Sequence, residues 1–186
     1  MGAREGKSKK PTRFRGFTQV YTGNGKGKTT AALGLALRAV GHRLKVMVIQ
    51  FLKGGIPYGE LRAARKLAPY LKIVSAGREV FVNKNHPHPK DVRLAKKGWK
   101  IAQQLIQGRK YQVVILDEIN IAIHYGLIPI KEVLDLIHNK PEDVELILTG
   151  RWARPEILRA ADLVTEMKEK KHYYRRGIES RIGIER

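Results

Sequence analysis

A glycine-rich stretch between residues 22 and 30, TGNGKGKTT, carries the residue types that bind phosphate. Its glycines fall at alternate positions and are Gly23, Gly25 and Gly27. They let the backbone curl so that successive N–H groups point at phosphate oxygens, and the start of the following helix favours an anion. Lys28 would add a full positive charge against the phosphates, and the Thr29 hydroxyl is placed for Mg²⁺. The stretch therefore predicts a P-loop that binds nucleotide phosphates.

The stretch departs from the general P-loop pattern at two positions. Thr22 stands where the pattern has its first glycine, and Lys26 is a second cation that ordinary P-loops do not require. A glycine-rich turn that binds nothing is the alternative interpretation. The flanking segments favour the P-loop, because an apolar strand over 15–21 precedes it and an apolar helix over 29–40 follows it. This helix is apolar nearly all round, so we expect it to be buried on all sides.

A second group of residues that could do chemistry is the acidic pair Asp117 and Glu118. The pair ends an apolar strand over 111–117, so it lies at the sheet edge where open α/β proteins bind ligands. One carboxylate can hold Mg²⁺ directly or through water, and the other can orient a water molecule or a substrate. A strand-ending aspartate that only caps the next turn is the alternative. The P-loop upstream favours the metal site.

The elements that must position these residues alternate between strands and helices. After the first strand and helix, apolar runs predict strands over 45–51, 71–74, 111–117, 144–149 and 163–167. Apolar periodicity predicts helices over 59–67, 95–106, 130–137 and 155–161, with a long loop over 75–90. This order predicts a three-layer α/β/α nucleotide-binding domain with a mostly parallel sheet covered on both faces.

Length and composition predict a single domain behind a short basic arm. The chain has 186 residues, of which 42% are hydrophobic, enough for a sizeable core. Residues 1–13 lack periodicity and are rich in Gly, Ser and Lys, so we expect a flexible arm there and one domain over 14–186. No apolar run reaches the roughly 18 residues of a membrane span. The absence of cysteine fits a reducing cytoplasm, and we expect a cytoplasmic protein.

The net charge of +20 is compatible with several kinds of partner. Nucleic acid, an anionic membrane and polyanionic small substrates would each be attracted. A strongly solvated surface, of the kind found in thermophiles, would have the same composition. The positive residues are spread along the chain rather than gathered in one block, so charge alone does not choose among these interpretations.

Five segments together resemble the P-loop type of ATP:cob(I)alamin (corrinoid) adenosyltransferase. The resemblance runs from about Phe17 to the C-terminus, and in this family both departures of the P-loop are normal. The segments are Thr22–Ala32, Val48–Gly54, Leu116–Asn120, Leu148–Arg151, and Lys171-His172 with Gly177 and Gly183-Ile184. The match is weaker over 75–90, where the family is expected to place aromatic residues after the glycine at Gly77. Here Phe81 is the only aromatic residue that follows it in the segment Arg78–Phe81.

The resemblance implies a RecA-like fold and a defined reaction. The enzyme would transfer the 5′-deoxyadenosyl group of ATP to Co(I) of a reduced corrinoid and release tripolyphosphate. It would use Mg²⁺ or Mn²⁺, with Lys28 and Glu118 as catalytic residues and Thr29, Asp117 and Glu118 as metal ligands. Phe81 would contact the corrinoid. The ATP-binding set would be Gly23, Asn24, Gly25, Lys26, Gly27, Lys28, Thr29, Thr30 and Arg151.

The resemblance also implies partners and a role for the arm. We expect a homodimer, a flavoprotein-type reductase as the source of electrons, and a basic arm over 1–13 that closes the site as a lid. Nucleic acid is not an expected partner. Two other functions stay open on the motifs alone: a RecA-like ATPase or nucleic-acid-binding module, in which Glu118 would activate water, and a P-loop nucleoside kinase.

Overall fold

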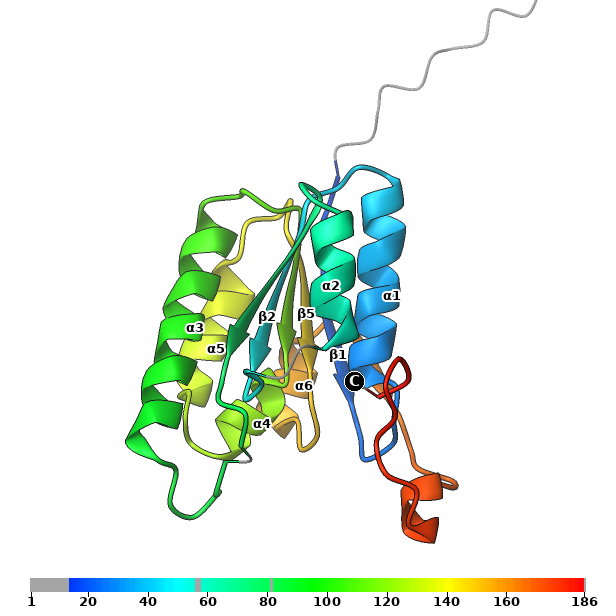
Figure 1. Cartoon of the computed structure of the whole chain (residues 1–186). Coiled ribbons are helices and arrows are strands. Elements are labelled where there is room, and N and C mark those ends of the chain that lie inside the picture. Colours follow the sequence, from blue (N-terminus) through cyan, green and yellow to red (C-terminus); the bar gives the residue numbers. More distant parts are fainter. Residues whose placement is uncertain (1–13, 56–57, 81, 186) are drawn as a thin grey trace, which may run out of the picture.

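The computed structural model describes residues 14–55, 58–80 and 82–185 (Figure 1). The predicted basic arm over 1–13 and the predicted corrinoid contact Phe81 lie outside the described residues. Within these described ranges, six strands form one sheet in the order β3-β2-β4-β5-β1-β6, and every neighbouring pair is parallel. They are β1 (Thr18–Thr22), β2 (Val46–Phe51), β3 (Leu71–Ala76), β4 (Val113–Asp117), β5 (Glu145–Thr149) and β6 (Leu163–Glu166).

Helices cover both faces of this sheet (Figure 1). They are α1 (Lys28–Gly41), α2 (Gly59–Lys66), α3 (Pro89–Gln107), α4 (Ile119–His124), α5 (Ile130–Asn139) and α6 (Pro155–Ala160), and a 3₁₀ turn spans Tyr173–Arg176. Alternate residues of the strands serve the two faces, as the two-residue period of a strand requires. On β2, Val46 and Val48 pack with α1 and α2, whereas Ile49 packs with α3 and α4. The prediction of a three-layer α/β/α domain with a mostly parallel sheet is confirmed.

The expectation that the first helix is buried on all sides is wrong. Only one stripe of α1 is buried, and Leu37 is 60% exposed. The helix lies on the outside of the sheet and contacts it along one face, so a uniformly apolar sequence still leaves half of its surface outward. The buried positions are Lys28, Ala32, Ala36 and Ala39, which follow the helical repeat.

The other predicted elements are present, with shifted ends. The predicted loop over 75–90 is shorter, because β3 continues to Ala76 and α3 begins at Pro89. The predicted helical stripe lies on α3 and is buried, with Trp99 3% exposed. Helix α4 and the 3₁₀ turn were not predicted. Among the described residues, no helix is long and apolar enough to cross a membrane.

Candidate nucleotide site

The P-loop and the acidic pair meet at the carboxyl edge of the sheet. The loop follows β1 and Asp117 ends β4, with β5 between the two strands. Two glycines of the loop have a positive φ, 95° at Gly23 and 120° at Gly27, which other residues rarely adopt. Gly25 N–H donates to the carbonyl of Met167, which follows β6, at 2.7 Å. The loop is therefore fixed between the first strand and the last.

Lys28 points back into its own loop. Its side chain is largely buried, and Nζ donates to the carbonyl of Gly25 at 2.6 Å. Burial lowers the pKa of the ammonium, while the charges of Glu118 and Asp117 act against this shift and that of Arg151 adds to it. An anion in the loop would supply the partner that this partly desolvated cation lacks.

Asp117 is fully buried and accepts three hydrogen bonds. Its Oδ1 accepts from the hydroxyl of Thr29 at 2.8 Å and from that of Thr149 at 2.7 Å. Its Oδ2 accepts from Nζ of Lys53 at 2.8 Å. Thr149 and Lys53 were not predicted as site residues. Thr149 ends β5 and Lys53 lies two residues after β2, the two strands that flank β4. Both residues fall within segments of the family resemblance, but the strand order is what shows that they meet Asp117.

Glu118 holds a strained position with an unsatisfied oxygen. Its φ of 63° is left-handed, and its backbone N–H donates to Oγ1 of Thr149 at 2.9 Å. Its Oε2 atom is buried and has no hydrogen-bond partner among the residues that the structure describes. Burial raises the pKa of this carboxyl, the neighbouring charge of Asp117 raises it further, and Lys53, Lys28 and Arg151 act in the opposite direction. A cation is the partner that this oxygen lacks.

These residues fit a Mg²⁺ ion that shares its ligands with a nucleotide. Hydroxyl and carboxylate oxygens are the donors that Mg²⁺ takes, and the free Oε2 of Glu118 is one such donor. Thr29 donates its proton to Asp117, so the lone pairs of its hydroxyl stay available. No group of three His, Cys, Asp or Glu in the described part of the chain could hold a metal by itself. The remaining ligands would be phosphate oxygens and water.

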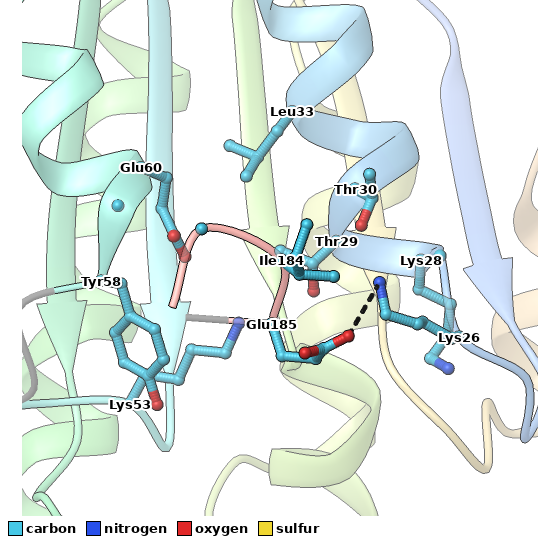
Figure 2. Close-up of a pocket in the computed structure, with 13 residues that line it drawn as sticks. Lys26, Lys28, Thr29, Thr30, Leu33, Lys53, Tyr58, Glu60, Ile184 and Glu185 are labelled. Carbon is cyan, nitrogen blue, oxygen red and sulfur yellow. Dashed lines mark ion pairs between the residues drawn. The ribbon is translucent and has the colours of Figure 1, made fainter. Parts of the chain in front are cut away.

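A pocket of about 510 Å³ opens over the loop (Figure 2). The P-loop residues Lys26 to Thr30 form one wall, and Lys53 and Tyr58 stand on the opposite side. The C-terminal residues Gly183, Ile184 and Glu185 also line it, because the tail returns to the start of α1 (Figure 1). Three lysines, Lys26, Lys28 and Lys53, thus line one open cavity, with Leu33, Tyr58 and Ile184 among its apolar parts.

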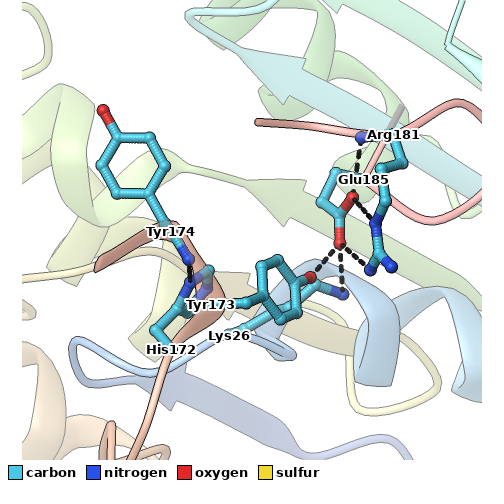
Figure 3. A network of polar contacts seen from close by, with 6 residues as sticks. All are labelled: Lys26, His172, Tyr173, Tyr174, Arg181 and Glu185. Atoms are coloured by element: carbon cyan, nitrogen blue, oxygen red, sulfur yellow. Dashed lines mark hydrogen bonds and ion pairs between the residues drawn. The ribbon is translucent and has the colours of Figure 1, made fainter. Parts of the chain in front are cut away.

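The tail brings a carboxylate to the loop (Figure 3). Glu185 accepts hydrogen bonds from the Tyr173 hydroxyl and from Arg181, and these donors lower its pKa to about 2. Nζ of Lys26 lies 4.0 Å from its Oε1. The second cation of the P-loop therefore faces a negative charge of the tail.

Two predicted ATP contacts face a different cavity. Asn24 and Arg151 line a neighbouring pocket of about 700 Å³ with Trp152 and residues of β6. Asn24 Oδ1 accepts from the backbone N–H of Glu169 at 3.0 Å. The structure therefore brings Lys26, Lys28, Thr29, Asp117 and Glu118 together with Thr30 at the rim, and it places Asn24 and Arg151 on the other side of the loop.

The sheet order, the loop and the acidic strand end define a P-loop nucleotide-binding protein. Comparison with known families narrows this class: residues 14–186 match the model of ATP:corrinoid adenosyltransferase BtuR/CobO/CobP. The chain belongs to this family, whose members adenosylate corrinoids.

Curated relatives agree with the family match. The corrinoid adenosyltransferase of Pseudomonas aeruginosa is 38% identical over 92% of this chain and 84% of its own length. That of Escherichia coli K12 is 36% identical over 92% of this chain and 86% of its own length. A solved KaiC-like protein, PH0186 of Pyrococcus horikoshii OT3, aligns with a TM-score of 0.48 at 19% identity, over 84% of this chain and 74% of that one.

Proposed function

We propose that this protein transfers the 5′-deoxyadenosyl group of ATP to Co(I) of a reduced corrinoid and releases tripolyphosphate, in the biosynthesis or salvage of adenosylcobalamin. The family match supports the substrates. The observation that carries the rest is the pocket over the P-loop, which Lys26, Lys28 and Lys53 line. A leaving group with the charge of tripolyphosphate needs such a set of cations.

The chemistry asks little of the protein beyond position and charge. Reduced cobalt is itself a strong nucleophile, so no general base is needed to attack the ribose 5′ carbon. Asp117 suits this reaction, because its oxygens accept three hydrogen bonds that hold the residues of the site in position. The protein would hold the triphosphate in line and keep water away from the reacting carbon.

Each site residue has a proposed part. Lys28 and the loop residues Gly23, Asn24, Gly25, Lys26 and Gly27 would surround the phosphates, with Thr30 at the rim. The N–H of Gly25 already donates to Met167, so the other N–H groups of the loop would make the phosphate contacts. Thr29, Asp117 and Glu118 would hold Mg²⁺, directly or through water, and the ion would neutralise charge on the phosphates. Arg151 would reach the nucleotide only from the neighbouring pocket. Phe81, outside the described residues, remains the proposed corrinoid contact.

We also make proposals on the location of the protein, its oligomeric state, its electron donor and the role of its N-terminal arm. We infer a cytoplasmic homodimer that receives its electrons from a flavoprotein-type reductase, as the family resemblance implies. Residues 1–13 would close the site as a lid in front of the single domain over 14–186. A protein lacking 1–13 should keep its nucleotide affinity and lose corrinoid turnover, and unchanged kinetics would remove the lid from the proposal.

The products of a single-turnover reaction test the function. We expect ATP, Mg²⁺ and chemically reduced cobalamin to give the spectrum of the adenosylated product, with one tripolyphosphate for each corrinoid. An ATPase or kinase breaks the bond to the terminal phosphoryl group and gives ADP instead. ADP and orthophosphate as main products, with no tripolyphosphate, would contradict the proposal.

A further inference from the structure

Lys53 is a largely buried cation at the edge of the nucleotide pocket. It follows β2, and its side chain is 20% exposed. Its Nζ forms an ion pair with Oδ2 of Asp117 at 2.8 Å. The Tyr58 ring lies 5.7 Å from Nζ, a second contact that favours a cation.

The backbone around Lys53 fixes where the ammonium can go. Leu52, just before it, has a φ of 61°, which turns the chain sharply at the end of β2. Gly54, just after it, packs so closely on Gly77 that an added Cβ would lie 2.0 Å from the Gly77 carbonyl oxygen. The side chain is therefore directed into the pocket from a rigid base, opposite Lys26 and Lys28 (Figure 2).

The contact with Asp117 does not occupy all the hydrogen-bond donors of the Lys53 ammonium. An ammonium has three donors, and one of them is directed at Asp117 Oδ2. The other carboxylate oxygen of Asp117 already accepts from Thr29 and Thr149. The open pocket offers Lys53 the room for further acceptors, and an anionic ligand there would supply them.

We propose that Lys53 is a second phosphate-binding lysine, which contacts the polyphosphate chain from the side opposite Lys28 and is positioned by its ion pair with Asp117. This inference rests on the proposed function, because it assumes that the polyphosphate lies in this pocket. Two cations on opposite sides of the pocket bind a long polyphosphate more tightly than they bind a single phosphate group. Lys53 therefore favours the tripolyphosphate end of the ligand.

The alternative role for Lys53 is neutralisation of Asp117 alone, and a set of variants separates the two. The probe is inorganic tripolyphosphate with Mg²⁺, measured by calorimetry without corrinoid. Lys53→Met should weaken its binding by about 10- to 100-fold, as expected for a lost charge-assisted hydrogen bond. The loss should be as large in an Asp117→Asn background as in the wild type. A loss that vanishes in this background would overturn the proposal.

A second measurement does not depend on the Asp117 variant. Orthophosphate contacts only part of the site, so Lys53→Met should weaken its binding by less than about threefold. If Lys53→Met weakened the binding of orthophosphate and of tripolyphosphate by the same factor, the role of Lys53 would be to neutralise Asp117 alone. This result would overturn the proposal. Lys66→Met, an exposed lysine at the end of α2, makes the same charge change away from the site and should have little effect.

Lys28→Ala distinguishes this inference from the proposed function. If Lys28→Ala does not weaken tripolyphosphate binding, the P-loop assignment fails whatever Lys53 does. If Lys28→Ala weakens it and Lys53→Met does not, only the inference on Lys53 fails. The thermal unfolding midpoint of each variant shows that the comparison is made between folded proteins.

Discussion

The hydroxyl of Thr29 donates to Oδ1 of Asp117 at 2.8 Å, although 88 positions separate the two residues in the chain. The bond joins the first turn of α1 to the end of β4 and fixes the distance between the P-loop and the acidic edge. It also orients the hydroxyl, because its proton is committed to Asp117 and its lone pairs face away. A single hydrogen bond thus sets both halves of the proposed metal site.

Replacement of the P-loop lysines should separate their roles. Lys28→Ala removes a buried charge from the loop, so nucleotide affinity should fall by about 100-fold and turnover should be lost. Lys26→Ala should cost less, because Nζ of Lys26 is more exposed and already faces Glu185 at 4.0 Å. Nucleotide titration and steady-state turnover measure both losses. A Lys28→Ala variant with near wild-type activity would contradict the P-loop assignment.

Binding of Mg²⁺-nucleotide should weaken at low pH through Glu118. Burial and the charge of Asp117 raise the pKa of this carboxyl. As the pH falls through this raised value, Glu118 takes up a proton and can no longer bind the ion, so affinity falls with it. Glu118→Gln should bind Mg²⁺-nucleotide weakly and without this pH dependence, and excess Mg²⁺ or Mn²⁺ should restore part of the binding.

The control for this prediction is nucleotide binding without the metal. In EDTA, wild type and Glu118→Gln should bind nucleotide with similar affinity, because the difference between them is the metal ligand. If the same pH dependence persists in Glu118→Gln, another group is responsible and Glu118 is not the ligand.

Neutralisation of the tail carboxylate should strengthen phosphate binding. Glu185 places a negative charge at the mouth of the pocket and faces Lys26. Glu185→Gln removes this charge, so tripolyphosphate affinity at low salt should rise by a factor of about 2 to 5, and the gain should shrink at high salt. Glu179→Gln makes the same change on the exposed tail away from the pocket and is the matched control. Weaker binding in Glu185→Gln would instead make the tail carboxylate a part of the binding site.

Substitution of a glycine by alanine in the P-loop should damage the site, whereas the same substitution on α1 should not. Gly23 has a φ of 95°, and an added Cβ would lie 2.4 Å from the carbonyl oxygen of Met167. Gly23→Ala should destabilise the fold by about 1–3 kcal/mol and abolish nucleotide binding. Gly34, on α1, has open space around it, so Gly34→Ala should stabilise the fold by about 0.5–1 kcal/mol. Thermal unfolding with and without nucleotide measures both, and a Gly23→Ala protein that binds normally would show that the loop is less constrained.

The sequence alone was sufficient to predict those features whose pattern lies in contiguous residues. The P-loop, the strand that ends in Asp117 and the alternation of elements can be read from contiguous residues, and the parallel sheet followed. Lys53 and Thr149 join the site only because β2 and β5 both neighbour β4, which no local pattern encodes. Glu185 joins it only because the tail folds back to α1. Arg151 follows β5, but the chain alone does not tell which side of the loop it faces.

The error on α1 has the same cause. Composition gives the apolarity of each residue but not how many layers lie around it. An apolar helix on the outside of a three-layer domain keeps one face outward, and only the arrangement of the layers decides which face.

The contact between Gly25 and Met167 has a consequence for the synthesis of the chain. The carbonyl that holds the P-loop backbone belongs to the residue after β6, so the loop is synthesised well before its support. A nascent chain that stops short of Met167 carries the whole P-loop sequence without this contact. The loop therefore reaches its supported conformation only after β6 has been made.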